Sequence, residues 1–344
     1  MTDNYIPWAE PKLWGNEKKY ILDALETNWI SGGPYVEKFE KSFQSLISSN
    51  FAISTSNGTT ALQAAFLAIN LRQGEEIIVP GFGYMAAANV AISMGVKPVF
   101  CDINPLTWCL DVNLIESLIN KNTRAIIAIH TYGNMCDMDN LYKLCNLYDI
   151  YLIEDAAESL GSTYKKKHAG TLGDIATYSF HATKTITTGE GGMITTNNPH
   201  LSELINLYRN HGVKQTKYLH EVPGLNLRLT NFQAAMGCAQ LEHFVQIKKV
   251  KNKQYNFYKK YFNNFEGVLL QEITPKCNPL MWATAIKLNE KYFSKNRDEI
   301  IMIFKENNIE TRPGFYSSDF MQNIYGSSNV PFSSKVSQSI ISFP

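Results

Sequence analysis

The sequence lacks long hydrophobic runs and a marked excess of charge of either sign. No apolar run approaches the roughly 20 residues that a membrane-spanning helix requires. The N-terminal segment carries prolines and charges instead of the apolar core of a secretory signal. Lys and Arg number 32 against 31 Asp and Glu, a net charge of +1, which does not favour general binding to nucleic acid or to anionic membranes. We therefore expect a cytoplasmic protein that binds neither nucleic acid nor membrane.

Two kinds of short motif are also missing. The cysteines form no CxxC pair, and no Cys/His spacing typical of structural zinc is present, so we expect no metal and interpret the cysteines as buried, reduced thiols. No GxGxxG follows the first strand, which argues against a dinucleotide enzyme. The 6 cysteines are Cys101, Cys109, Cys136, Cys145, Cys238 and Cys277.

What the sequence does contain is an alternation of strand and helix patterns. With 344 residues, 44% of them hydrophobic, the chain has room for one large domain and a smaller one. Short β-branched or aromatic runs alternate with helical patterns, which predicts an α/β fold with a mostly parallel sheet between helices. Ligands of such sheets gather beyond the carboxyl ends of the strands. The predicted strands are 75–80, 97–103, 124–133 and 150–156, and the predicted helices between them are 59–70, 85–95, 112–121 and 138–149.

The pattern changes after about residue 172. Two extended stretches flank a Thr- and Gly-rich segment within 173–198, which predicts neighbouring strands with a functional loop. A long helical pattern over 232–265 follows, of a length that commonly bridges two domains. A strand at 281–288 and a helix at 297–307 complete a small α+β domain. We expect residues 1–240, including an N-terminal arm, to form the large cofactor-binding domain and 241–344 the small one.

The polar residues at the expected strand ends carry the information on function. Ser56–Ala61 joins an extended run to a helix, and the free amides of a helix N-terminus beside Thr hydroxyls suit a phosphate, although a plain helix cap has the same sequence. Asp155, at the end of an apolar strand, is compatible with metal binding, acid/base work or helix capping. Lys184 precedes a Gly-rich turn and is either a solvated loop residue or an amine suited to Schiff-base chemistry.

Together these segments resemble the DegT-type sugar aminotransferases, fold-type-I enzymes that use pyridoxal 5′-phosphate. The resemblance extends from about Trp8 to Pro344, and its most specific element is YSFHATKTITTGEGGMI. Four further motifs follow the order of the family, namely SNGTTAL, EDAAESLGSTY, NLRLTNFQAA and IETRPGFY.

The resemblance implies roles for the core of the site. Lys184 would hold the cofactor aldehyde as a Schiff base and shuttle the proton during transfer. Asp155 would pair with the pyridine nitrogen and keep it protonated. Ser179, Gly58 and Thr59 would hold the cofactor phosphate.

Further positions match the family less specifically. Tyr84 would stack on the pyridine ring, and Glu158 would lie near the ring hydroxyl, where a carboxylate must share a proton or be repelled. Asn226 matches a residue that reaches the phosphate of the neighbouring subunit, which implies a homodimer with shared active sites. We expect the substrate to contact Trp29, His181, Arg228 and Arg312, although a core tryptophan, a satisfied strand histidine and a structural ion-pair arginine would look alike in the sequence.

The sequence departs from the family pattern at two places. Where family members commonly have Gly in the turn of a YKGK segment, this chain has Tyr164–Lys167, so we expect a different turn geometry without catalytic effect. The sequence also ends at SIISFP, where relatives usually continue through another helix. Either the sequence is shortened there or the small domain is reduced, and we expect closure over the substrate from that side to be affected.

The resulting hypothesis is a pyridoxal phosphate-dependent aminotransferase that passes through the pyridoxamine phosphate form. It would take the amino group from L-glutamate and deliver it to the 4-keto group of a nucleotide-linked deoxysugar, for surface polysaccharide or amino-sugar synthesis. Amination of another keto position or of a small phosphorylated ketone is an alternative within the family. A cofactor-binding regulator without turnover and a Rossmann-like nucleotide-binding protein are alternatives of other classes.

Overall fold

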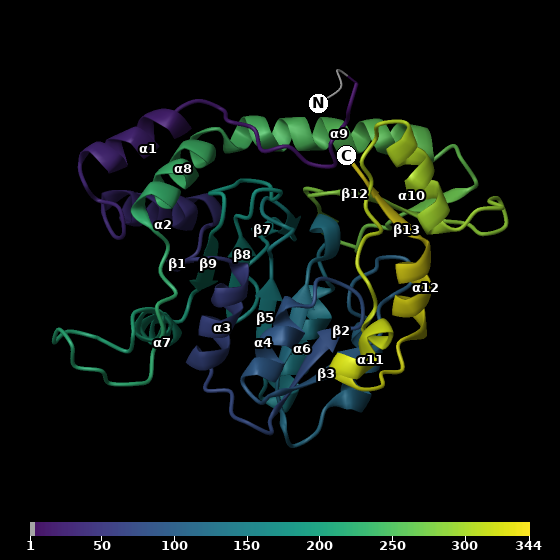
Figure 1. Cartoon of the computed structure of the whole chain (residues 1–344). Helices are drawn as coiled ribbons and strands as arrows, with labels where there is room; N and C mark the ends of the chain where they lie inside the picture. The colour runs from purple at the N-terminus through teal and green to yellow at the C-terminus, as the bar shows by residue number, and fades with distance from the viewer. Residues whose placement is uncertain (1–3) are drawn as a thin grey trace.

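A seven-stranded sheet forms the centre of the computed structural model, which describes residues 4–344 (Figure 1). Its strand order is β1-β9-β8-β5-β4-β2-β3. The five strands from β8 to β3 run parallel, whereas β9 is antiparallel to both of its neighbours. The prediction of an α/β fold with a mostly parallel sheet is confirmed. The strands are β1 (Phe51–Thr55), β2 (Glu76–Pro80), β3 (Lys97–Cys101), β4 (Thr123–Ile129), β5 (Tyr151–Asp155), β8 (Ile175–Ser179) and β9 (Gly192–Thr196).

Helices cover both faces of this sheet. Neighbouring residues of a strand point to opposite faces, so one strand contributes to the core on each side. Ile78 joins the core with residues of α2, α6 and α8, while Ile77 and Val79 join the core with residues of α3, α4 and α7. Within residues 4–344, no helix is long and apolar enough to cross a membrane. The helices of the first part of the chain are α1 (Glu17–Glu26), α2 (Pro34–Ile47), α3 (Gly58–Ala68), α4 (Ala86–Ser93), α5 (Val112–Ile115), α6 (Met138–Tyr148) and α7 (Pro199–Arg209).

Several predicted elements end earlier than expected. The predicted helix 112–121 is only α5 followed by a 3₁₀ turn, and β4 stops at Ile129 before a second 3₁₀ turn at Thr131–Gly133. The predicted helix 232–265 is wrong as a single element. It is divided at His243 into α8 (Asn231–Glu242) and α9 (Phe244–Phe262). The bend lets α8 pack against α1 and α2, while α9 contacts β10 (Val268–Leu270) in the last part of the chain.

The C-terminal residues form a second, three-stranded antiparallel sheet. Its strands are β10 (Val268–Leu270), β12 (Thr284–Leu288) and β13 (Ile340–Phe343). Helix α9 runs along the top of this part in Figure 1, beside α10 (Arg297–Glu306). The N-terminal segment reaches the same region, since Trp8 Nε1 donates a hydrogen bond of 3.0 Å to Ser342 Oγ. Two further helices are α11 (Gln322–Tyr325) and α12 (Pro331–Ser339), and 3₁₀ turns cover Glu116–Leu118 and Ser318–Met321.

A third small sheet contains the departure from the family pattern at Tyr164–Lys167. Strands β6 (Thr163–Tyr164), β7 (Lys167–His168) and β11 (Cys277–Asn278) form it. Lys165 and Lys166 both have positive φ, 49° and 67°, as the two central residues of a type I′ hairpin turn require. The lysines therefore occupy the left-handed conformation that favours glycine. Lys165 is held there by an ion pair of 2.7 Å to Asp139.

All six cysteines are free, and only Cys277 is not fully buried. This agrees with their interpretation as buried thiols.

Candidate active site

Predicted site residues follow three strands of the central sheet. Tyr84 comes after β2, Asp155 ends β5 and Ser179 ends β8. These strands are parallel, so their carboxyl ends meet at the same edge. Lys184 lies in the turn after β8, where its backbone N–H donates a 2.9 Å hydrogen bond to the His181 carbonyl.

Lys184 carries a buried amine with a lowered pKa. Its side chain is only 14% exposed, and its Nζ lies 3.8 Å from Glu158 Oε1. On its other side the amine lies over the indole of Trp282, 3.9 Å from the ring centroid. Burial lowers the pKa of Lys184, against the opposing effect of the Glu158 and Asp155 charges. A lysine whose neutral form is favoured in this way is suited to nucleophilic attack on a carbonyl.

Two carboxylates accompany this amine. Burial raises the pKa of Glu158 to about 7, although the Lys184 charge and a hydrogen bond from the Tyr132 N–H act in the opposite direction. That hydrogen bond, 2.7 Å to Oε2, fixes the Glu158 carboxylate. Burial also raises the pKa of Asp155, whose Oδ1 accepts a 3.1 Å hydrogen bond from the Ala157 N–H.

The start of α3 forms a small cradle beside β8. Asn57 caps the helix by accepting a 2.9 Å hydrogen bond from Thr60 N, which leaves the earlier amides of Gly58 and Thr59 without partners inside the helix. A Cβ on Gly58 would lie 3.0 Å from Ser179 Cβ. Glycine therefore leaves open the space between the helix N-terminus and the Ser179 hydroxyl.

Strand register brings this cradle to the lysine. Thr55 and Ser179 both pair with Gly192, the first residue of β9. A side chain at Gly192 would collide with the Asn57 carbonyl at 2.4 Å, so only glycine allows the α3 cap to approach. The predicted phosphate residues Gly58, Thr59 and Ser179 thus lie together next to the loop of Lys184.

Other predicted residues lie at the margin of this arrangement. Tyr84 is 63% exposed, with its ring centroid 6.3 Å from that of Phe315. Asn226 is exposed and forms an isolated bridge with Asn210. Arg228 donates a 2.6 Å hydrogen bond to the Asn210 side chain and borders a surface groove along α7.

Three further predicted substrate residues are held by neighbours in this structure. The Arg312 guanidinium lies 4.1 Å from the Trp8 ring centroid and 3.4 Å from Glu310 Oε1. His181 Nε2 lies 3.8 Å from Glu190 Oε1. Trp29 is 56% exposed, and its carbonyl accepts a hydrogen bond from the Asn231 side chain.

Two residues in direct contact with this site were not predicted from the sequence. Tyr132, with a φ of 59°, turns its N–H toward Glu158. Trp282, in the loop before β12, contacts Lys184, although the two residues lie far apart in the sequence. The Tyr132 segment HTYG forms the end of the predicted strand 124–133, whereas β4 stops at Ile129. No local pattern marked Trp282.

The sequence is similar to a known family and to characterised relatives. Residues 11–344 match the model of the DegT/DnrJ/EryC1/StrS aminotransferase family. The chain is 38% identical to GDP-perosamine synthase of Vibrio cholerae over 316 residues, which are 90% of this chain and 85% of that protein.

Solved structures of similar shape include PseC and DesI. Helicobacter pylori PseC, an aminotransferase of pseudoaminic acid biosynthesis, has a TM-score of 0.93 and 25% identity, with 99% of this chain and 93% of that chain covered. DesI, solved in the presence of its TDP-sugar product, has a TM-score of 0.93 and 26% identity, with 100% and 88% covered.

The chain therefore belongs to the DegT/DnrJ/EryC1/StrS aminotransferase family. The predictions of this family, of a pyridoxal phosphate-dependent transaminase and of its cofactor are confirmed. The Rossmann-like nucleotide-binding alternative is wrong.

The residues present fit that cofactor. The space that a Cβ on Gly58 would fill, beside free helix amides and the Ser179 hydroxyl, suits a phosphate. The buried carboxylate of Asp155 suits a protonated pyridine nitrogen, and the buried amine of Lys184 suits an aldehyde.

Proposed function

We propose that this protein transfers an amino group from L-glutamate to the 4-keto group of a nucleotide-linked 6-deoxy sugar. The observation that carries the proposal is the buried triplet Lys184, Glu158 and Asp155 at the sheet edge, in a chain 38% identical to a GDP-perosamine synthase. That relative makes GDP the first nucleotide to test. Synthesis of amino sugars for surface polysaccharide, in the cytoplasm, is the proposed setting.

Pyridoxal phosphate, when bound, supplies an electron sink conjugated to the substrate amine. Around it, Gly58, Thr59 and Ser179 would hold the phosphate with amide and hydroxyl donors, and Tyr84 would cover the ring. Asp155 would hold a proton on the pyridine nitrogen. Its burial, which raises its own pKa, also excludes water that would compete for that contact.

Lys184 would move the proton at the substrate carbon. Burial lowers the pKa of its amine, which favours the neutral form that can accept a proton. Glu158, 3.8 Å away with a pKa of about 7, can hold or release a proton near neutral pH. The two groups together would keep one mobile proton at the site.

The protein would work as a homodimer with shared sites. Asn226 is exposed, and the half-buried Arg228 donates a hydrogen bond to the Asn210 side chain. We propose that they reach the neighbouring subunit's site, with Asn226 at the phosphate and Arg228 at the substrate.

The acceptor carries two phosphates and needs cationic donors away from the cofactor. Arg312, 47% exposed at its side chain, is the proposed donor, because a guanidinium can engage phosphate oxygens bidentately. His181 and Trp29 would complete the wall of this subsite. Glu310, the present partner of Arg312, must share or release the guanidinium when the acceptor binds.

The proposal is tested by incubating the loaded protein with L-glutamate and a panel of acceptors. The panel contains GDP-, dTDP- and UDP-linked 4-keto-6-deoxy sugars, a 3-keto isomer and small keto-phosphates, with amine products detected by mass spectrometry. We expect one 4-keto nucleotide sugar to give the highest kcat/KM. A preference for a small keto-phosphate or for the 3-keto isomer would overturn the substrate assignment, and no amine from any acceptor would favour a regulator without turnover.

The variant Arg312→Ala tests whether Arg312 binds the acceptor. It should weaken the acceptor by roughly 1.5–3 kcal/mol, the range for hydrogen bonds to charged groups, with the glutamate half-reaction nearly unchanged. Equal losses in both half-reactions would assign Arg312 a structural role with Glu310.

A further inference from the structure

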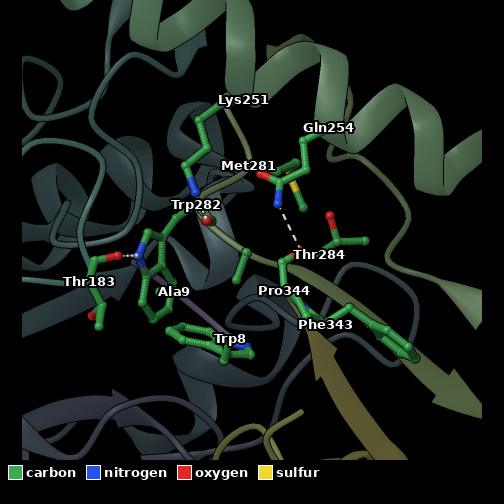
Figure 2. A pocket seen from close by; sticks show the side chains of 11 residues that line it. Trp8, Ala9, Thr183, Lys251, Gln254, Met281, Trp282, Thr284, Phe343 and Pro344 are labelled. Carbon is green, nitrogen blue, oxygen red and sulfur yellow. Dashed lines mark hydrogen bonds between the residues drawn. The ribbon is translucent and has the colours of Figure 1, made fainter. Parts of the chain in front are cut away.

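The indole of Trp282 contacts the Lys184 amine, as Glu158 does. Lys184 Nζ lies 3.9 Å from the ring centroid, over its face. The edge of the same ring is fixed to the lysine's own loop, since Trp282 Nε1 donates a 2.6 Å hydrogen bond to the Thr183 carbonyl. Figure 2 shows this bond as a dashed line between Thr183 and Trp282. One side chain from the loop before β12 thus contacts both the catalytic amine and the residue preceding it.

The ring is held in place from its other sides. Trp8 packs edge-on against it at a centroid distance of 5.4 Å, and Tyr132 stacks at 6.4 Å. On the backbone, the Trp282 carbonyl accepts a 3.1 Å hydrogen bond from Lys251 Nζ of α9, and both residues line the small cavity drawn in Figure 2. Trp282 is 8% exposed. An immobile ring of this kind fixes the position of whatever lies on its face.

The electrostatics at Lys184 give that ring face a specific effect. Burial disfavours the ammonium, while Glu158 and Asp155, on the segment that ends and follows β5, favour it. Among residues 4–344, these two carboxylates are the charged side chains that act on the pKa of Lys184. The nearby Lys251 of α9 donates its hydrogen bond to the Trp282 carbonyl. The negative face of an aromatic ring attracts a cation, and more strongly where the cation is desolvated. The indole therefore stabilises the charged form of an amine whose burial favours the neutral form.

We propose that Trp282 is a positioning residue of the transaminase, whose indole face holds the Lys184 amine in place whenever that amine is not joined to the cofactor and stabilises the ammonium that forms when the amine accepts a proton from the substrate carbon. This inference rests on the proposed role of Lys184. The substrate's arrival releases the lysine, and the released amine then needs a fixed place within reach of the reacting carbon. The ring provides that place, opposite Glu158, and the bond to Thr183 keeps the ring aligned with the lysine loop.

The test measures the titration of Lys184 in the cofactor-free protein, so that it does not depend on turnover. Competitive labelling with acetic anhydride across a pH series, read by mass spectrometry on the peptide containing Lys184, gives the pKa of that amine. The variants are Trp282→Phe, which keeps a weaker aromatic face and loses the N–H, and Trp282→Leu. The matched control is Trp8→Phe, which alters a ring that touches Trp282 and not Lys184.

We expect the pKa of Lys184 to fall by about 0.5–1.5 pH units in Trp282→Leu, the size of a desolvated cation–π contact. Trp282→Phe should give a smaller fall, and Trp8→Phe none. An unchanged or raised pKa in both Trp282 variants would overturn the proposal.

Fluorinated tryptophan keeps the test decisive if a variant fails to fold. Incorporation of mono-, di- and trifluorotryptophan preserves the shape of the ring while weakening its negative face. The pKa of Lys184 should fall stepwise with fluorination in the wild-type sequence and stay constant with fluorination in Trp282→Phe. No stepwise change would refute the contact, whereas a stepwise change in a protein without transaminase activity would refute only the proposed function.

Discussion

The burial of Glu158 makes a prediction about stability that needs neither cofactor nor substrate. Glu158 has a pKa of about 7 in the folded protein against 4.5 for an unperturbed carboxyl, and burial is the largest cause. Between these two values the folded state binds the proton more tightly, so stability must fall as the pH rises through this window. For a carboxyl with these two pKa values the loss between pH 5 and pH 8 is about 2–3 kcal/mol. Glu158→Gln should abolish this loss, because the amide cannot ionise and its oxygen can still accept the Tyr132 N–H.

The assay is the unfolding of cofactor-free wild type and Glu158→Gln in urea at several pH values from 5 to 8. The wild type should lose stability relative to the variant as the pH rises, so that the variant is the more stable protein at pH 8. Glu306→Gln removes an exposed carboxylate from α10 and serves as the control. Parallel pH curves for wild type and Glu158→Gln would refute the claim that burial perturbs this carboxyl in the folded protein.

Three further predictions concern the cofactor site. Lys184→Ala should retain cofactor through the phosphate cradle and lose turnover, which equilibrium dialysis and a transamination assay measure separately; retained turnover would remove the lysine from its role. Gly58→Val should weaken cofactor binding at least tenfold, since its side chain fills the space next to Ser179, and unchanged affinity would argue against a phosphate there. Mixing Lys184→Ala with Asn226→Ala chains should regenerate activity in mixed dimers, provided that the Asn226 variant alone is severely impaired; no recovery after proven subunit exchange would refute shared sites.

Much of this site could be predicted from the sequence, because it follows strand ends. Apolar runs marked β2, β4 and β5, and parallel strands bring the polar residues after them to one edge. Asp155 and Glu158, three residues apart, and Lys184 after β8 were therefore expected near one another. The motif resemblance then supplied their roles, which composition and spacing alone left open.

What the sequence did not reveal depends on contacts between distant segments. Trp282 reaches Lys184 only because β12 and α9 pack beside the large sheet, and no periodicity encodes that approach. The break at His243 was missed because the helical pattern continues across it, while α8 and α9 pack against different parts of the molecule. The division into domains at residues 240 and 241 and the roles of Arg228 and Arg312 stay predictions.

The most direct test of the central claim is a transfer experiment with ¹⁵N-labelled L-glutamate. The cofactor-loaded protein receives the labelled donor and the preferred nucleotide keto-sugar, and mass spectrometry follows the label together with 2-oxoglutarate. We predict one ¹⁵N-labelled amino sugar for each 2-oxoglutarate formed, and no label in the product with Lys184→Ala. Unlabelled or absent product from the wild type, or equal labelling by Lys184→Ala, would contradict an aminotransferase that works through Lys184.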